Sequence, residues 1–315
     1  MIKNPVLYIV VPCYNEEEVL PETTKRLNEK LTSLINNGKV SKDSRVLFVN
    51  DGSKDKTWSI IEETHNSNSL FEGVKLSRNF GHQNALMAGL SVAKEKCDIS
   101  ISMDADLQDD INAIDQMIDA YYEGNEVVYG VRSARKKDTF FKKATAEGFY
   151  KLMKKMGVDI VFNHADYRLL SKVALDRLFQ FDETNLFIRG IVPRIGYQST
   201  TVEYERNERF AGTSKYPLKK MLAFAVDGIT SFSIKPLFNI FWLGVFMSCL
   251  GFVSFVTLAV LMYFFSVISI LWPIVAALMC FTGIILIVLG VVAVYVGKSY
   301  MEIKHRPTFI IEKVI

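Results

Sequence analysis

Short apolar runs alternate with stretches of helical spacing through the first half of the chain. The runs have the length and composition of buried strands, and each ends in a cluster of polar, turn-forming residues; they cover 6–11, 45–49, 73–76 and 97–103. Helical spacing follows, for example over Glu18–Leu34 and Asn84–Lys94. This alternation is typical of a parallel sheet with helices packed on its faces. The sequence therefore predicts an α/β fold with a mostly parallel, Rossmann-like sheet.

The pattern changes near the C-terminal end, where residues 236–297 contain no Asp, Glu, Lys, Arg or His. A polar break over 266–273 divides this stretch into two apolar segments, 238–265 and 274–297. Each segment exceeds the roughly 20 residues that a helix needs to cross the hydrocarbon core of a bilayer. We therefore predict two transmembrane helices; the alternative is a buried helical hairpin of a soluble protein.

The charges that flank the two apolar segments predict their orientation. Basic residues precede the first segment and follow the second, whereas the connection 266–269 has none; they are Lys219, Lys220, Lys235, Lys298, Lys304, His305 and Arg306. The positive-inside rule then places both termini and the domain before the hairpin in the cytoplasm of a cell-membrane protein. The predicted organisation is a cytoplasmic domain (1–216), a juxtamembrane helix (217–235), a transmembrane hairpin (236–300) and a cytoplasmic tail (301–315).

The net charge of +3 is too small to indicate a nucleic-acid-binding protein, but basic residues gather in 132–155. Over 140–157 the helical spacing places Phe141 and Phe149 on one face and Lys151 and other lysines opposite. Such a helix can lie at a membrane surface with its lysines towards anionic lipid. The alternative is a soluble amphipathic helix with a charged outer face. The four cysteines have no paired spacing and indicate free thiols.

The strongest chemical signal is the acidic stretch 100–110, SISMDADLQDD. Asp104 and Asp106 come directly after a predicted strand, and in open α/β sheets ligands bind at the carboxyl ends of strands. Two carboxylates at this spacing can hold one Mg²⁺ or Mn²⁺ ion and leave coordination positions for a diphosphate. The alternative is a solvated acidic loop.

The loops after the first two predicted strands offer further polar groups. Residues 12–17 supply an aromatic ring, an amide and carboxylates, which suit the stacking and edge contacts of a nucleobase. Residues 50–57 contain Asp and Gly in a tight turn. Ordinary helix capping and a plain turn between strand and helix are the alternatives. Neither a G-x-G-x-x-G pattern nor a Walker lysine loop occurs, so nothing requires a dinucleotide or ATP site.

Four motifs in this order resemble those of the GT-A family 2 glycosyltransferases: VVPCYNE (10–16), VNDGS (49–53), SRNFG (77–81) and DADLQ (104–108). The chain is most similar to the polyprenyl-phosphate branch, which includes dolichol-phosphate mannose synthases and bacterial bactoprenol glucosyltransferases. The resemblance covers essentially the whole length, including the two predicted spans. It implies a GT-A catalytic domain followed by two C-terminal transmembrane helices.

The resemblance also implies roles for individual residues. Pro12, Tyr14 and Glu16 match the nucleotide-sugar loop, and Asp51 matches the carboxylate that fixes the nucleobase or ribose. The metal site of the family is matched by Asp104, Asp106 and Gln108. Asp104 also matches a nucleotide-sugar-binding residue, and Asp106 also matches a catalytic residue. Arg132 matches a catalytic arginine near the acceptor phosphate; the alternative is one more cation in a basic segment.

Asp166 matches the family position often assigned a catalytic base. Because the second pKa of a phosphate monoester lies near 6, the acceptor needs little deprotonation, and Asp166 can instead orient a sugar hydroxyl or the attacking phosphate. A helix cap is the structural alternative for Asp166. Arg209, Ser214 and Lys215 resemble an R-x-x-G-x-S-K loop that closes over a phosphate, with a basic juxtamembrane linker as the alternative.

The implied reaction is an inverting, metal-dependent transfer of a sugar from a nucleotide sugar to polyprenyl (undecaprenyl) phosphate, which gives a lipid-linked sugar for cell-envelope polymers. UDP-glucose is the favoured donor, with UDP-GlcNAc and GDP-mannose as alternatives, and a small homo-oligomer is expected. A processive polysaccharide synthase would carry Q-x-x-R-W, and no Arg-Trp pair occurs. A non-enzymatic scaffold that binds a nucleotide sugar would be expected to lack the carboxylates of the site, whereas Asp51, Asp104 and Asp106 are all present.

Overall fold

The computed structural model describes residues 3–133, 164–183, 187–205, 229–230, 233, 235–264 and 271–315. The chain divides into two compact units. The first, here called the sheet unit, comprises residues 1–150, 159–217 and 306–315; the second, the helical unit, comprises 151–158 and 218–305. The predicted interfacial helix at 140–157, the connection 266–269 and most of the predicted juxtamembrane helix at 217–235 lie outside the described residues.

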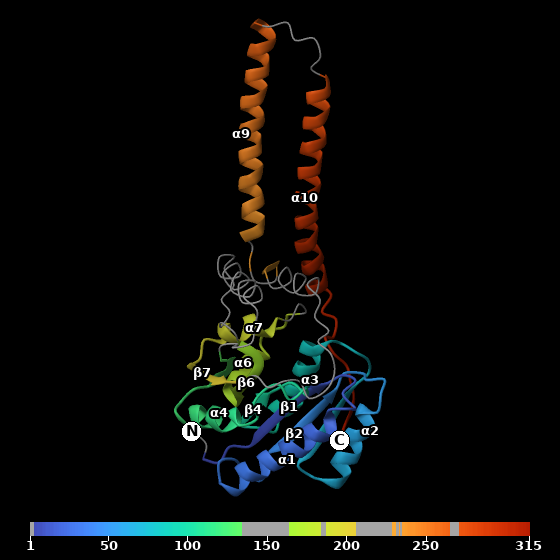
Figure 1. Cartoon of the computed structure of the whole chain (residues 1–315), viewed down its shortest axis with the longest axis vertical. Helices are drawn as coiled ribbons and strands as arrows, with labels where there is room; N and C mark the ends of the chain where they lie inside the picture. The colour runs from blue at the N-terminus through green and yellow to red at the C-terminus, as the bar shows by residue number, and fades with distance from the viewer. Residues whose placement is uncertain are drawn as a thin grey trace. The chain divides into compact units, whose positions relative to one another are not determined.

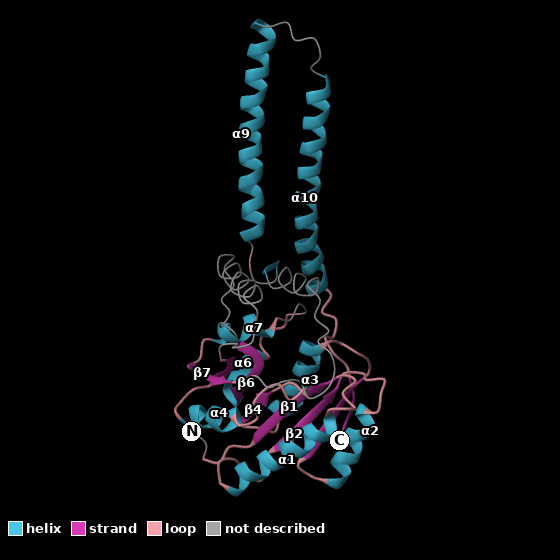
Figure 2. Cartoon of the chain, viewed as in Figure 1, coloured by secondary structure: helices cyan, strands magenta, loops and turns pink. Residues whose placement is uncertain are grey.

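A single mixed sheet forms the centre of the sheet unit (Figure 2). Its strands are β1 (Leu7–Cys13), β2 (Arg45–Asn50), β3 (Phe71–Leu76), β4 (Ile99–Ser102), β5 (Val127–Arg132), β6 (His164–Ser171), β7 (Ser199–Tyr204) and β8 (Ile311–Val314). Their order across the sheet is β7-β5-β6-β4-β1-β2-β3-β8. β4, β1, β2 and β3 are parallel neighbours, as the alternating pattern predicts. The prediction of an α/β fold with a mostly parallel sheet is confirmed.

Helices cover both faces of the sheet (Figure 1). In the sheet unit they are α1 (Leu20–Asn36), α2 (Thr57–Ser67), α3 (His82–Lys94), α4 (Ala113–Tyr122), α6 (Lys172–Leu178) and α7 (Ile188–Ile191), with a 3₁₀ turn, η1 (Val192–Ile195). α3 packs unusually close to β1 and β2, because a Cβ atom on Gly89 would lie 2.5 Å from Val10 Cγ1 and 2.6 Å from Val49 Cγ2. This close approach fixes the start of α3 at the carboxyl end of the central strands.

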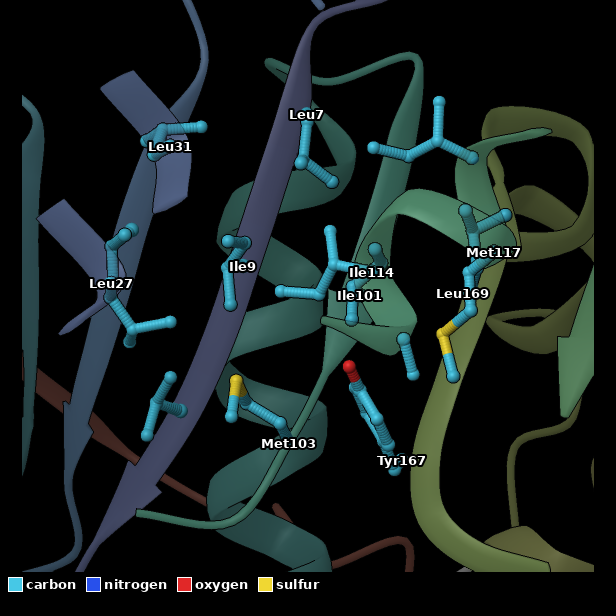
Figure 3. Close-up of a cluster of buried hydrophobic side chains, with 14 of the residues drawn as sticks. Leu7, Ile9, Leu27, Leu31, Ile101, Met103, Ile114, Met117, Tyr167 and Leu169 are labelled. Atoms are coloured by element: carbon cyan, nitrogen blue, oxygen red, sulfur yellow. The ribbon is translucent and has the colours of Figure 1, made fainter. Parts of the chain in front are cut away.

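A hydrophobic core lies on the face of the sheet opposite α3. Because side chains alternate along a strand, Leu7 and Ile9 of β1 point to this face while Val10 points to α3. Figure 3 shows these residues packed among side chains of the neighbouring elements, and those labelled with them are Leu27, Leu31, Ile101, Met103, Ile114, Met117, Tyr167 and Leu169. The core therefore holds α1 and α4 against the strands whose ends carry the acidic stretch.

Two strands on one side of the sheet do not follow the parallel pattern. β6 runs antiparallel to both β4 and β5, with Ser102 opposite Arg168, and β7 pairs parallel to β5. The sequence did not predict β6 or β7, because β6 begins with polar residues and four of the six residues of β7 are not buried. The alternative that Asp166 caps a helix is wrong: Asp166 lies in β6, and Ser171 is the residue that caps α6.

β8 adds the other edge of the sheet from the far end of the chain. It pairs antiparallel with β3, and Gly73 and Ile315 exchange backbone hydrogen bonds of 3.0 and 2.9 Å. Lys75 pairs with Glu312 at 2.7 Å across the two strands. The sequence indicated a cytoplasmic tail at 301–315, whereas residues 311–314 form a strand that belongs to the sheet unit. Only pairing with β3 makes this short segment a strand.

The helical unit contains two long apolar helices, α9 (Lys235–Phe264) and α10 (Leu271–Ile303). The hydroxyl of Tyr295 in α10 donates a 2.6 Å hydrogen bond to the carbonyl oxygen of Ser233, just before α9. Within the described residues, Phe281–Ile303 is long and apolar enough to cross a bilayer, with a mean hydropathy of 2.2, and Lys235–Gly251 is a shorter apolar segment. The described residues thus hold one candidate span, and the predicted pair of spans is not confirmed.

Candidate functional site

The residues expected to bind substrate gather at one edge of the sheet. β1, β2 and β4 are parallel, so their carboxyl ends and the loops that follow lie together. β6 runs the other way, and its beginning therefore lies beside the end of β4. The Ser102 hydroxyl donates a 2.5 Å hydrogen bond to the carbonyl oxygen of Asp166, which places Asp166 at the level of the acidic stretch. The fold thus brings residues far apart in sequence to one place.

The acidic stretch alternates between buried and accessible side chains after β4 ends. Asp104, Asp106 and Gln108 are half-buried, whereas the intervening Ala105 and Leu107 are buried. The Thr23 hydroxyl of α1 donates a 2.9 Å hydrogen bond to the Ala105 carbonyl and ties the loop to the core. The three predicted metal ligands are therefore the partly accessible positions of one anchored segment.

A left-handed turn lies between two of these predicted ligands. Leu107 has φ = 57°, a conformation that residues other than glycine rarely adopt. Its buried side chain anchors the turn, and the Gln108 N–H donates a 3.1 Å hydrogen bond to Asp106 Oδ1. Strained backbone of this kind is concentrated at ligand-binding sites, where the surrounding structure holds it in place. The turn brings the Asp106 carboxylate and the start of Gln108 together.

The donor set fits a cation that a substrate helps to bind. Among the described residues, no group of three or more His, Cys, Asp or Glu side chains is arranged to hold a metal ion. Asp104, Asp106 and Gln108 supply two carboxylates and an amide in one short segment, and all three side chains are half-buried. Mg²⁺ in phosphate-transfer sites is commonly held by one or two carboxylates, with water and substrate phosphates filling the other positions. These residues fit such an ion.

The loops after β1 and β2 are joined by a series of hydrogen bonds. The Asn15 N–H donates to Ser53 Oγ at 3.0 Å, and Asn15 Oδ1 accepts from the Lys54 N–H at 2.9 Å. The Glu16 N–H donates to Thr57 Oγ1 at 2.9 Å. Tyr14, between Pro12 in β1 and this joined segment, is 43% exposed. Tyr14 is therefore accessible beside two loops that are hydrogen-bonded to each other, and stacking on a nucleobase requires such access.

Asp51 braces a third loop against this pair. Its side chain is buried, with Oδ1 accepting from the Phe80 N–H at 2.7 Å and Oδ2 from the Gly81 N–H at 3.0 Å. Burial raises the pKa of Asp51, and the two backbone donors oppose that shift. Gly52 follows with φ = 62° and passes so close to Arg78 that there is no room for a side chain. Asp51 and Gly52 together hold the 77–81 loop at the end of β2.

Replacing Gly52 with alanine is expected to open this contact. The new Cβ would lie 2.4 Å from the Arg78 carbonyl carbon, so one loop must move. We expect a loss of unfolding free energy well above the ~1–2 kcal/mol of left-handed strain alone, and a KM for the nucleotide sugar raised about tenfold or more. Thermal unfolding and donor kinetics measure both effects.

Gly38→Ala is the matched control for Gly52→Ala. Gly38 has φ = 66°, but nothing lies within 4 Å of the added Cβ. It should show the strain of about 1–2 kcal/mol with an unchanged donor KM. Equal effects of the two substitutions on KM would contradict a role for the close contact between the loops.

Arg132 is held at the end of β5 by Asp109, which belongs to the acidic stretch, and by Tyr204. Its Nε donates to the Tyr204 hydroxyl at 3.3 Å, and that hydroxyl donates to Asp109 Oδ1 at 2.5 Å. Arg132 Nη2 lies 3.7 Å from the same Asp109 oxygen. Burial, and then the nearby charge of Asp104, raise the pKa of Asp109, while the Tyr204 hydrogen bond and Arg132 oppose the shift. Asp109 and Tyr204 thus fix the position of the Arg132 guanidinium.

Asp166 is enclosed by two arginines. Arg168 Nη2 donates to Asp166 Oδ1 at 2.6 Å, and Arg189 donates from Nε to Oδ1 at 3.2 Å and from Nη2 to Oδ2 at 2.9 Å. Burial alone raises the pKa of Asp166, but the charges of Arg189 and Arg168 outweigh burial and hold it well below its ordinary value. The carboxylate is therefore ionised at neutral pH with both oxygens engaged.

His82, the first residue of α3, lies between this cluster and the acidic stretch. Its Nε2 is 3.5 Å from Asp104 Oδ1 and 3.7 Å from Asp166 Oδ2. Asp104 and Asp166, which are far apart in sequence, are consequently separated by one imidazole ring. The predicted metal ligands and the arginine-bound carboxylate therefore form one continuous polar site.

The structure brings most of the predicted residues together, and it adds others. Arg209, Ser214 and Lys215 lie outside the described residues. Residues that the sequence analysis did not assign to the site are His82, Asp109, Arg168, Arg189 and Tyr204. Asp109 directly follows the DADLQ motif and His82 directly follows the SRNFG motif, so their positions in the sequence could have indicated that they belong to the site. Arg189 carries no local signal, because only the packing of α7 places it beside β6.

Comparison with known proteins agrees with the geometry of this site. The sequence pattern of Glycosyl transferase family 2 matches residues 8–179. The chain is 48% identical to the uncharacterized glycosyltransferase YkoT of Bacillus subtilis, over 98% of this chain and 92% of that protein. It is 36% identical to the SfII prophage-derived bactoprenol glucosyl transferase of Shigella flexneri, over 97% of each chain.

A solved structure also matches this chain, at much lower sequence identity. The crystal structure of glucosyl-3-phosphoglycerate synthase from Mycobacterium tuberculosis, in complex with Mn²⁺, UDP and phosphoglyceric acid, matches with a TM-score of 0.47. The match has 16% identity and covers 72% of this chain and 76% of that one.

The mostly parallel α/β sheet, with a D-x-D segment at the end of the central strand β4, is GT-A-like. The chain belongs to glycosyltransferase family 2, and the protein is a glycosyltransferase.

Proposed function

We propose that this glycosyltransferase transfers a sugar, with inversion, from a nucleotide sugar to the phosphate of a polyprenyl phosphate lipid. The observation that carries the proposal is that the partly accessible Asp104, Asp106 and Gln108 follow β4 in a loop close to two arginines: Arg132 contacts Asp109 of the same loop, and Arg189 contacts Asp166, which shares His82 with Asp104. Carboxylates that hold a cation and arginines that bind phosphate are the groups this transfer needs. Similarity to a bactoprenol glucosyl transferase over 97% of the chain supports the lipid acceptor.

The donor binds along the loops after β1 and β2. In this proposal Tyr14 stacks on the nucleobase, and Pro12 and Glu16 shape the rest of the pocket. Asp51 keeps two backbone contacts, and each of its oxygens has a second lone pair that can accept from a ribose hydroxyl. UDP-glucose is the donor we favour, since the relative of 36% identity is described as a glucosyl transferase; UDP-GlcNAc and GDP-mannose are the alternatives.

Asp104, Asp106 and Gln108 would hold the Mg²⁺ or Mn²⁺ ion. When bound, this ion supplies charge stabilisation to the diphosphate that leaves the sugar. The chain's own residues supply the rest: Arg132, fixed by Asp109 and Tyr204, orients the acceptor phosphate for attack on the anomeric carbon. Alignment and electrostatic stabilisation then account for most of the rate increase. Arg209, Ser214 and Lys215 are proposed to close over a phosphate.

The hairpin is proposed to cross the membrane twice. Residues 306–315 after α10 belong to the sheet unit, as do the residues that lead into the helical unit. A segment that leaves a folded unit and returns to it crosses a bilayer an even number of times. If the candidate span in α10 crosses, α9 must cross as well, and its 30 residues extend ~45 Å, more than the ~30 Å of hydrocarbon.

Under this proposal the domain at 1–216, the interfacial helix at 140–157, the juxtamembrane helix at 217–235 and residues 301–315 all lie on the cytoplasmic side. The basic residues that flank the hairpin favour this orientation.

Cysteine labelling in intact cells tests this topology. In a chain whose own cysteines are replaced by alanine, Ser269→Cys should react with a membrane-impermeant maleimide from outside the cell. Val314→Cys in β8, whose side chain is 45% exposed, should react only after the membrane is permeabilised. Labelling of position 314 in intact cells, or of position 269 only after permeabilisation, would contradict the two-span arrangement.

A panel of donors tests the reaction itself. Membranes that contain the protein are incubated with undecaprenyl phosphate and radiolabelled UDP-glucose, UDP-GlcNAc or GDP-mannose, and the lipids are then extracted. We expect one donor to transfer its label to an acid-labile lipid, with release of the nucleoside diphosphate. Label that stays in the water phase with every donor, or that enters a high-molecular-weight polymer without a lipid intermediate, would count against the proposal.

A further inference from the structure

Two arginines contact one carboxylate in the site, and they differ sharply in burial. The side chain of Arg168 is 1% exposed and that of Asp166 15%, whereas Arg189 is 31% exposed. Nε and Nη1 of Arg168 are buried without a hydrogen-bond partner among the described residues. An ionised group is placed in such surroundings only when an opposite charge compensates it. Arg168 and Asp166 therefore balance one another on the buried side of the cluster.

The second guanidinium is the more accessible of the two. Arg168 and Asp166 pair in the protein interior, whereas the Arg189 side chain is 31% exposed. Arg189 is therefore the arginine of this pair that a substrate can reach. Its contacts with Asp166 run through Nε and Nη2 and fix the plane of the guanidinium.

The backbone that carries Arg189 is held firmly. The neighbouring Ile188 and Ile191 are buried, and the Ile188 N–H donates a 2.9 Å hydrogen bond to Gln83 Oε1 at the start of α3. His82, next to Gln83, lies between Asp166 and Asp104. Arg189 is therefore positioned within a few side chains of the predicted metal ligands, where a substrate phosphate must lie if the proposed function is correct.

The geometry also limits what Asp166 can do. A general base must have an oxygen available for the proton that it takes up, and its pKa should lie near the working pH. Asp166 Oδ1 accepts from both guanidinium groups and Oδ2 accepts from Arg189, and these two positive charges oppose the uptake of a proton by the carboxylate. A carboxylate held in this way is suited to orient a cation.

We propose that Arg189 binds a phosphate group of the substrate and that Asp166 is a positioning residue, which holds the Arg189 guanidinium in place and does not remove a proton. The inference rests on the proposed function, because it names a further phosphate-binding residue of the same site. The phosphate belongs either to the diphosphate of the donor or to the acceptor lipid. Both present the same chemistry to a guanidinium, and kinetics separates them.

Arg189→Gln tests the first half of the proposal, because it removes the charge and leaves Asp166 paired with Arg168. In detergent-solubilised full-length protein, it should raise the KM for one phosphate substrate by about 10- to 100-fold, the range of a charge-assisted hydrogen bond. Arg189→Lys should recover part of this loss, since a lysine keeps the charge but lacks the planar fork. A raised donor KM assigns the contact to the diphosphate, and a raised lipid KM assigns it to the acceptor phosphate.

Arg194→Gln is the matched control for charge. Arg194 lies on the next turn, is exposed and loses the same charge on substitution. Its KM values should stay within about twofold of the wild-type values. The proposal is overturned if Arg189→Gln changes neither KM by more than Arg194→Gln does.

A double-mutant cycle tests the second half. Asp166→Asn keeps an acceptor for Arg168, and in the Arg189→Gln background it should cause little further loss, because its effect acts through Arg189. The dependence of kcat on pH should also keep its acid limb in Asp166→Asn. If Asp166→Asn lowers kcat by the same factor in both backgrounds and removes that limb, Asp166 is the base. Should Asp166→Asn fail to fold, the two Arg189 variants still decide whether Arg189 binds phosphate.

Equilibrium binding separates this inference from the proposed function. If wild-type protein forms no lipid-linked sugar with any donor, the proposed function fails, but calorimetric titration with inorganic pyrophosphate and with farnesyl phosphate still compares wild type with Arg189→Gln. Weaker binding of either probe by about tenfold or more supports a phosphate site at Arg189. Unchanged binding of both probes overturns it.

Discussion

Asp106→Asn is expected to lower the rate of sugar transfer by at least about a thousandfold while the sheet unit stays folded. The amide keeps the size of the side chain and an Oδ1 that accepts the Gln108 N–H, so the loop can retain its shape. It removes the negative charge that would hold the cation. Several kcal/mol of charge stabilisation on the leaving diphosphate correspond to about three powers of ten in rate. Initial rates of lipid-linked sugar formation, together with a thermal melt, measure the effect.

Asp110→Asn is the matched control for Asp106→Asn. It removes one negative charge from the same loop, and its Oδ1 can still accept the Asn112 N–H, which Asp110 accepts at 2.9 Å. Because Asp110 is not one of the predicted ligands, the rate of sugar transfer by Asp110→Asn should stay within a few-fold of the wild-type rate. If Asp106→Asn and Asp110→Asn slow the reaction equally, general loss of charge explains the result, and the role of Asp106 as a ligand is contradicted.

Asp166→Ala is expected to lower the free energy of unfolding of the sheet unit by about 3–5 kcal/mol. Alanine offers no acceptor, so it leaves the buried guanidinium of Arg168 without its 2.6 Å partner. An unpaired buried charge is among the most destabilising changes that one substitution can make. Denaturant unfolding of the solubilised protein, followed by the signal of the sheet unit, gives the magnitude.

Asp119→Ala provides the comparison for this stability effect. Asp119 pairs with Lys39 at 2.8 Å, but its side chain is 55% exposed, so the change should be less than about 1 kcal/mol. A loss of similar size for Asp166→Ala would show that the arginine cluster does not stabilise the fold.

The stability effect of Asp166 should also depend on pH in a defined direction. The folded state lowers the pKa of Asp166, because its two arginines outweigh the effect of burial. Its contribution is therefore fully present above the unfolded pKa of about 3.9 and is lost as the pH falls below that value towards the folded pKa. The difference between wild type and Asp166→Ala should be constant from pH 6 to 8 and shrink in acid.

The central strands were predictable because their pattern is local. The run 46–49 is continuously apolar and is followed by turn residues, which is the signature of a strand buried on both faces. The strands β6 and β8, which lie farther out in the sheet, were not predictable from a local pattern. β6 is identified only by its pairing with β4 and β5, and β8 only by its pairing with β3, far away in sequence.

The site divides along the same line. Asp104 and Asp106 follow a strand directly, so the sequence locates them at the edge of the sheet, and the structure shows them accessible there. The residues that hydrogen-bond to the acidic stretch come from other elements; for example, Tyr204 of β7 donates to Asp109. The sequence also left open whether Asp166 acts as a base, because its arginine contacts depend on β6 and α7 being adjacent.

Binding of Mn²⁺ followed by electron paramagnetic resonance tests most directly whether the carboxylates at the end of β4 hold a cation together with the donor's diphosphate. Purified full-length protein is titrated with Mn²⁺ alone and in the presence of UDP or GDP, and the same is done with Asp106→Asn. The account predicts one site in the wild type that tightens at least tenfold with one nucleotide and is lost in Asp106→Asn. A Mn²⁺ affinity that neither nucleotide changes, or that is the same in Asp106→Asn as in the wild type, would contradict it.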